Sequence, residues 1–119
     1  MLQKFVVFVH AKEDEGAKFA HALMYANELK DAGHEVQLVF DGASVKTLAN
    51  LTADPERPVY KLYQSLTEKG VIQGACEFCS NIMGVQEQLS NTGLSLLSEA
   101  NGHPSIAEYV AKGFTPIVM

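Results

Sequence analysis

The sequence predicts a single α/β domain in which five parallel strands form one sheet between two layers of helices. Short apolar runs rich in Val, Ile and Phe alternate with longer segments whose apolar residues recur every three or four positions. Strands that alternate with helices join through crossover connections, which makes their sheet parallel. The chain has 119 residues, of which 47% are hydrophobic, and this length suits one core. We therefore expect one domain over residues 1–119.

The first strand and the first helix have the clearest patterns. Residues 5–9, Phe-Val-Val-Phe-Val, are apolar on both faces, which is typical of a central parallel strand covered by helices on both sides. Residues 14–32 have helical periodicity and end before Gly33, a residue type that commonly stops a helix. Residues 35–40 alternate at first and then become fully apolar. We interpret them as a second strand that lies nearer the edge of the sheet.

The rest of the chain continues this alternation. We expect a helix at 43–50, a helix at 59–69 with Pro58 in its first turn, a strand at 71–75, a helix from about 78 to 91, a strand at 94–98, a helix at 105–112 and a strand at 114–118. Pro116 lacks an N–H group, which places the last strand at a sheet edge. A doubly wound sheet of five strands most often has the order 2-1-3-4-5, so we predict a flavodoxin-like three-layer sandwich.

Composition and motifs exclude several classes of function. The net charge is −5 and the nine basic residues are scattered, which argues against direct binding of nucleic acid. No apolar run approaches the ~20 residues of a membrane-spanning helix, and residues 1–4 carry no secretory signal, so we expect a cytoplasmic protein without membrane contact. Residues 10–16 lack the Gly-x-Gly-x-x-Gly pattern of a dinucleotide site, and we predict no cofactor.

The only two cysteines of the sequence, Cys76 and Cys79, lie where the third predicted strand gives way to a helix, and they are the main candidates for a chemical role. Ligands of doubly wound sheets bind beyond the carboxyl ends of the strands, and the predicted order places His10 opposite Cys76 there. A cysteine at a helix start has its pKa lowered by the unpaired N–H groups, and a protonated His10 would add to this effect. Glu77, between the two thiols, would raise their pKa instead.

Three other interpretations of the cysteine pair remain open. Both thiols can be small core residues of a non-enzymatic assembly or binding module. They can serve thiol redox chemistry, although the chain has no Trp and its dithiol follows a later strand than in thioredoxins. A zinc site would need His10 or His103 as further ligands, and we predict no metal.

Asp41 follows the second strand and can reach a ligand there, but an Asp-Gly pair after a strand usually forms a plain turn. We expect His103 to cap the last helix.

A family resemblance supports chemistry at Cys76. The cysteine after the third strand is followed eight residues later by Gly84-Val85, and residues 108–114 lead from the last helix into the last strand. In these features and in length the chain resembles the DsrE/DsrF-like family, which has the YchN-like fold. The resemblance places Cys76 on the family's sulfur-carrying cysteine, whereas Cys79 stands where many members have a small residue.

The resemblance implies a persulfide carrier or a sulfurtransferase subunit that assembles into a homo-oligomer, a trimer or a hexamer. It also implies protein partners that donate and accept the sulfur. We predict a sulfur-relay protein in which Cys76 holds sulfane sulfur as a persulfide, Cys79 acts as the resolving thiol and His10 stabilises the thiolate. Whether the chain acts as an enzyme by itself stays open, because a fold alone does not prove function.

Overall fold

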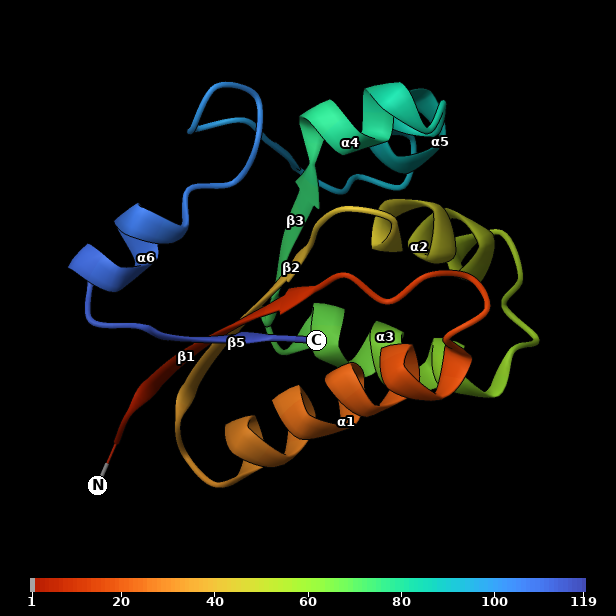
Figure 1. The fold of residues 1–119 in the computed structure, drawn as a ribbon. Coiled ribbons are helices and arrows are strands. Elements are labelled where there is room, and N and C mark those ends of the chain that lie inside the picture. The colour runs from red at the N-terminus through yellow and green to blue at the C-terminus, as the bar shows by residue number, and fades with distance from the viewer. Residues whose placement is uncertain (1) are drawn as a thin grey trace.

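Residues 2–119 are described by the computed structural model, in which a five-stranded sheet is flanked by helices (Figure 1). The elements in chain order are β1 (Lys4–Val9), α1 (Gly16–Asp31), β2 (Glu35–Phe40), α2 (Ser44–Thr52), α3 (Pro58–Glu68), β3 (Ile72–Cys76), α4 (Glu77–Ile82), α5 (Gln86–Ser90), β4 (Leu96–Leu97), α6 (Ile106–Ala111) and β5 (Thr115–Val118). Every neighbouring pair of strands is parallel. The predicted α/β class with one parallel sheet of five strands is therefore confirmed.

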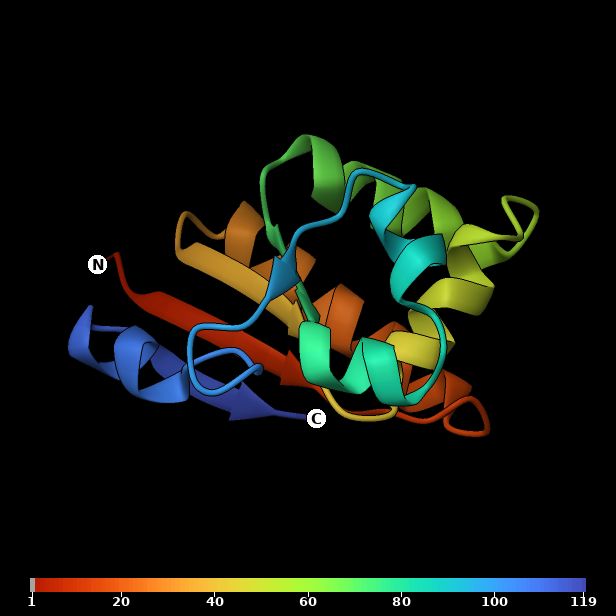
Figure 2. The same ribbon diagram turned by 90° about the horizontal axis from the view of Figure 1, so that it is seen from above.

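The strand order is β4-β3-β2-β1-β5, so the predicted order 2-1-3-4-5 is wrong. Each of the first three connections moves to the next strand in one direction, and right-handed crossovers then place all their helices on one face. The connection from β4 to β5 runs back across the sheet, and its helix α6 lies on the other face (Figures 1 and 2). Because β5 pairs only with β1, Pro116 does lie in an edge strand as predicted.

The second strand lies inside the sheet rather than near its edge. β2 pairs with β1 on one side and with β3 on the other. Its early alternation has a different cause, because one face of this part of the sheet is only partly covered. Gln37 of β2 and Gln73 of β3 line a polar pocket there together with Glu99 and Lys112. Polar residues on one face of a strand thus mark a thinly covered face and need not mark an edge.

Two hydrophobic cores lie on the two faces of the sheet. The larger one joins the strands to the helices of the first face, and its fully buried members include Leu38, Phe40 and Leu66. The smaller one contains Phe8 and Phe114, and Tyr109 of α6 packs against it. This uneven division follows from the chain order, because only one crossover helix reaches the second face.

Two elements differ from their predicted form in ways that affect the surroundings of Cys76. The helix expected from about 78 to 91 is divided into α4 and α5, because Gly84 lies between them with φ +71, a conformation that ends a helix. The strand expected at 94–98 pairs only over Leu96–Leu97. Its pairing is confined to the carboxyl end of β3, where Ala75 faces Leu96 and Cys76 faces Leu97.

Candidate dithiol site

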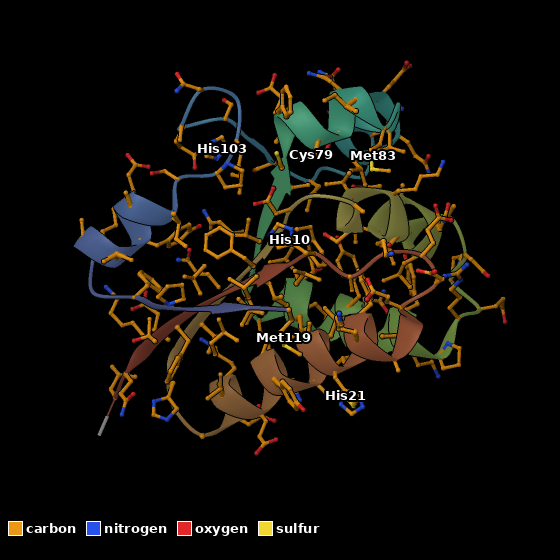
Figure 3. The ribbon with its side chains drawn as sticks, viewed as in Figure 1. His10, His21, Cys79, Met83, His103 and Met119 are labelled. Atoms are coloured by element: carbon orange, nitrogen blue, oxygen red, sulfur yellow. The ribbon has the colours of Figure 1, made fainter. Side chains whose placement is uncertain are left out.

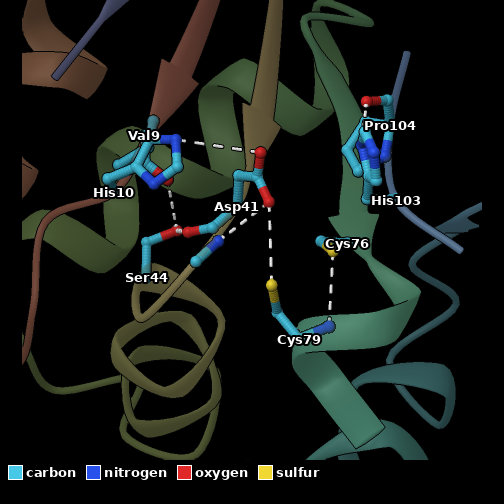
Figure 4. Close-up of polar contacts among 9 residues, drawn as sticks. Val9, His10, Asp41, Ser44, Cys76, Cys79, His103 and Pro104 are labelled. Carbon is cyan, nitrogen blue, oxygen red and sulfur yellow. Dashed lines mark hydrogen bonds and ion pairs between the residues drawn. The ribbon is translucent and has the colours of Figure 1, made fainter. Parts of the chain in front are cut away.

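Strand register places three polar residues in a row at the carboxyl end of the sheet. Val9 of β1 pairs with Phe40 of β2, and Phe40 pairs with Ala75 of β3. The residues that follow these three positions are His10, Asp41 and Cys76. The row has Asp41 in its middle, so His10 is not directly opposite Cys76 as the predicted strand order implied. Figure 4 shows Asp41 between the histidine and the cysteines.

The point where the chain changes faces also differs from the expected one. Helices that follow β1, β2 and β3 pack on one face, and α6, which follows β4, packs on the other. The crevice between diverging connections therefore opens beside β3 and β4, not between β1 and β3. Cys76 is the last residue of β3 and pairs with Leu97 of β4. It lies at the true switch point, although for a different reason from the one we expected.

Cys76 is fixed by its place between strand and helix. It ends β3 and is the N-cap of α4, and its Sγ accepts a hydrogen bond from the Cys79 backbone N–H at 3.3 Å. The Ser80 hydroxyl donates to the Cys76 carbonyl oxygen at 2.6 Å. The cysteine side chain has no exposed surface, with 0% relative accessibility. The thiol is thus held in one place and is shielded from solvent.

Cys79 lies one helical turn further on and is only partly buried. Its Sγ lies 3.7 Å from Oδ1 of Asp41, and the thiol donates toward this carboxylate oxygen. Both cysteines are free thiols. The structure therefore brings together the two thiols that the sequence predicted and one carboxylate that it did not select.

Asp41 is oriented by the turn that follows β2. The Gly42 backbone N–H donates to Oδ1 of Asp41 at 2.9 Å. The Ser44 hydroxyl is buried and lies 2.6 Å from the Val9 carbonyl oxygen and 2.8 Å from the Asp41 carbonyl oxygen, so it ties the ends of β1 and β2 together. The turn that we expected from the Asp-Gly pair is present, and it aims the carboxylate at the thiols.

His10 contacts Asp41 from the side away from the cysteines. Its Nε2 lies 3.7 Å from Oδ2 of Asp41, and its side chain is 46% exposed. A Cβ atom on Gly42 would lie only 2.7 Å from His10 Nδ1, so a glycine at position 42 leaves room for the ring. Within residues 2–119, the polar side-chain contact of His10 is with the carboxylate and not with either sulfur. Its influence on the thiols therefore passes through Asp41.

The pKa of Cys76 runs opposite to the expectation from its helix-start position. Burial, together with smaller contributions from the Cys79 side chain and the Asp41 carboxylate, raises this pKa from 9.0 to about 12, although the hydrogen bond from the Cys79 N–H lowers it. Loss of water around the thiolate outweighs the N–H groups of a helix that has only six residues. Cys76 is thus a neutral thiol at neutral pH, and Asp41 is the carboxylate that acts on it, whereas the sequence pointed to Glu77.

This raised pKa predicts a loss of stability at alkaline pH. The folded state holds the Cys76 proton up to about pH 12, whereas the unfolded chain releases it near 9.0, so the stabilisation is complete below pH 9 and is lost as the pH rises toward 12. We expect the free energy of unfolding, measured in urea with a reductant, to fall less steeply with rising pH in Cys76→Ala than in the wild type. Equal slopes in the wild type and Cys76→Ala would contradict the shift. Burial also raises the pKa of Tyr109 to about 12, and this residue contributes equally to the pH dependence of the wild type and of the variant.

His103 does not cap the last helix as expected. The Ser105 hydroxyl accepts a hydrogen bond from the Glu108 N–H and caps α6, while Nδ1 of His103 lies 2.8 Å from the Pro104 carbonyl oxygen. Asp41 is the site residue that the sequence pattern did not single out, because an Asp-Gly pair after a strand usually forms a plain turn. Its position directly after a strand was visible, but only the correct strand order places it beside Cys76.

The fold and the site define a class: a parallel α/β domain with a cysteine-based site where a strand gives way to a helix. The sequence model of the DsrE/DsrF-like family matches residues 3–118, nearly the whole chain. The protein belongs to this family, as the resemblance of the residues around Cys76 indicated.

The chain is also similar to two proteins of other organisms. An uncharacterized protein of Methanocaldococcus jannaschii, MJ0733, is 27% identical over 112 residues, which are 92% of this chain and 88% of that protein. A conserved protein of unknown function from Bacteroides thetaiotaomicron, BT1422, has a similar structure, with a TM-score of 0.70 over 98% of this chain and 95% of that one. Its sequence identity of 22% makes this a likeness of fold. In the part of the chain that the structure describes, no helix combines the length and the apolar character needed to cross a membrane.

Proposed function

We propose that this protein is a sulfur relay that carries sulfane sulfur as a persulfide on Cys76 and passes it to a protein partner. Membership in the DsrE/DsrF-like family suggests a sulfur-relay role. The observation that carries the finer proposal is a pair of free thiols, with Sγ atoms within 4.8 Å of each other, at the switch point of the sheet. A persulfide can move between thiols at this separation after small side-chain rotations.

The different exposure of the two thiols supports an order of events. Cys79 is partly exposed and meets a donor first, while Cys76 lies behind it without exposed surface. The Cys79 thiolate attacks the outer sulfur of a donor persulfide, and the donor leaves as a thiol. The Cys76 thiol gives up its proton as its sulfur attacks the outer sulfur on Cys79, and the leaving Cys79 thiolate takes up a proton, so the sulfur comes to lie on the buried side chain. Each step exchanges one sulfur–sulfur bond for another and needs no oxidant.

Delivery to an acceptor retraces this path through Cys79. Attack of the second cysteine on the inner sulfur instead releases hydrogen sulfide and leaves a disulfide, which is the resolving role that we expected of Cys79. Thiols from solution could release hydrogen sulfide in the same way, but the burial of Cys76 keeps them from reaching the inner sulfur of its persulfide. The Asp41 carboxylate orients the Cys79 thiol by accepting its hydrogen bond, and His10 lies against the other oxygen of this carboxylate.

Exposed apolar side chains beside the site support partner binding. Phe78 is 55% exposed and Ile82 is 69% exposed, and both lie on α4 with Cys79. Met83 follows this helix and is exposed as well (Figure 3). Apolar side chains grouped next to a reactive thiol suit the docking of a sulfur donor or acceptor protein. Homo-oligomer formation, as a trimer or hexamer, is part of the same proposal.

Loading with inorganic polysulfide under anaerobic conditions tests the proposal. We expect mass spectrometry of the wild type to find one added sulfur atom, mapped to Cys76. Cys79→Ser should still load at Cys76 but more slowly, because the donor must wait for the buried thiol to open; an opening cost of ~1.4 kcal/mol slows loading about tenfold. Cys76→Ser should hold the sulfur only on Cys79.

The competing function is an assembly module in which both cysteines are core residues. The complete burial of Cys76 favours it. It predicts that Cys76→Ala lowers the free energy of unfolding and that polysulfide adds sulfur to neither cysteine. No added sulfur on either residue, together with failure of iodoacetamide to alkylate either thiol in the folded protein, would exclude the relay.

A further inference from the structure

The two thiols and the carboxylate that the strand order brings together also meet the requirements of a metal site. One ligand atom from each of Asp41, Cys76 and Cys79 lies within 4.8 Å of the other two. We propose that these three residues bind Zn²⁺, which goes beyond the sulfur relay. From the sequence we predicted no metal, because only His10 and His103 offered themselves as further ligands beside the cysteines. Neither is needed, since Asp41 supplies the third ligand.

The spacing of the ligand atoms fits tetrahedral zinc. Zinc lies about 2.3 Å from a thiolate sulfur and about 2.0–2.2 Å from a carboxylate oxygen, so such ligands are roughly 3.5–3.8 Å apart around one ion. The Sγ of Cys79 and Oδ1 of Asp41 are already 3.7 Å apart. The distances from Cys76 Sγ to the other two ligand atoms are within 4.8 Å, and side-chain rotations that move these atoms by about 1 Å would bring them to the spacing of a zinc site.

The ligand atoms are also oriented by neighbouring groups, as in established metal sites. The Cys79 N–H points at Cys76 Sγ at 3.3 Å, and the Gly42 N–H points at Asp41 Oδ1 at 2.9 Å. The second carboxylate oxygen, Oδ2, faces His10. Asp41 thus presents one oxygen to the thiols and gives the other to a supporting imidazole, and outer contacts of this kind hold a ligand in place.

The donor set selects the kind of metal. When zinc displaces the protons of the two thiols, the resulting set of two thiolates and one carboxylate favours Zn²⁺ over Mg²⁺ and Ca²⁺, which take oxygen ligands. Three protein ligands leave a fourth position for water or for a thiol from outside. Zinc bound here would occupy both sulfur atoms, so metal binding and sulfur loading exclude each other on this site.

Calorimetric titration of metal-free, reduced protein with Zn²⁺ tests the site without any sulfur chemistry. We expect one equivalent to bind, and Asp41→Asn and Cys79→Ser to weaken binding at least about tenfold. Asp54→Asn is the matched control, because this exposed carboxylate pairs with Arg57 away from the site and its loss should leave the affinity unchanged. Replacement of zinc by Co²⁺ should give the sulfur-to-cobalt absorption of thiolate coordination in the wild type and not in Cys79→Ser.

A measurement on the wild type alone guards against variants that fail to fold. One equivalent of Zn²⁺ should slow alkylation of Cys79 by iodoacetamide and raise the melting temperature, while Mg²⁺ should do neither. Absence of stoichiometric binding, or an affinity unchanged in both Asp41→Asn and Cys79→Ser, would overturn the zinc site. Polysulfide loading is a separate experiment, so either proposal can fail while the other stands.

Discussion

Replacing Gly74 with alanine is expected to destabilise the protein by about 3 kcal/mol. Gly74 has φ +156, and an added Cβ would collide with the Ser95 carbonyl oxygen and lie 3.0 Å from Leu97 Cγ. This carbonyl accepts the hydrogen bond from the Ala75 N–H at 3.0 Å. The collision would therefore separate β4 from β3 directly before Cys76. Urea unfolding measures the loss, and polysulfide loading should fall with it.

Gly70→Ala is the control for this substitution. Gly70 also has a positive φ, +74, but a Cβ atom there meets nothing within 4 Å. It should cost only the backbone strain of an alanine in that conformation, about 1 kcal/mol. Equal losses in the two variants would show that contact with β4 contributes nothing to the stability of the site.

Replacing Phe40 with alanine should have the largest effect, a loss of about 3–5 kcal/mol. Phe40 has no exposed surface and packs between Phe19 and Tyr63, with ring centroids at 5.7 Å and 6.2 Å. Truncation would open a cavity where β2 meets α1 and α3. Phe40 also directly precedes Asp41, so we expect the cavity to loosen the carboxylate that faces the thiols.

Phe78→Ala has the same chemistry at an exposed position and is the matched control. Phe78 is 55% exposed, so its truncation should change the free energy of unfolding by no more than about 0.5 kcal/mol. Thermal and urea unfolding of both variants give the comparison. A loss at Phe78 as large as that at Phe40 would mean that the face of α4 is buried in solution, as an interface between copies of the chain would make it.

The centre of the site is a contact between three connections of the sheet. Asp41 comes from the turn after β2, and the two cysteines come from the junction of β3 and α4. His10, after β1, adds support from the far side of the carboxylate. Asp41 therefore links the thiols to the rest of the sheet, and both the zinc proposal and the relay proposal assign it a role.

Local patterns in the sequence were sufficient to predict most of the elements. Continuous apolar residues from Phe5 to Val9 form a buried strand in any arrangement of the sheet, and Pro116 is excluded from an interior strand because it lacks an N–H group. The junction of strand and helix at Cys76 was likewise predictable from an apolar run that changes to helical spacing. These features depend on neighbours in the chain, which the sequence displays directly.

Strand order, and with it the partner of the thiols, was decided only by the tertiary structure. The alternation at Gln37 predicted an edge, but it arises because a single helix, α6, leaves part of one face of the sheet open. With β2 in the interior, Asp41 rather than His10 lies beside Cys76. The pKa of this thiol is raised by burial, whereas its position at the start of a helix predicted a lowered pKa. Contacts between distant segments and the exclusion of water set these properties, and neither is encoded in the spacing of residues along the chain.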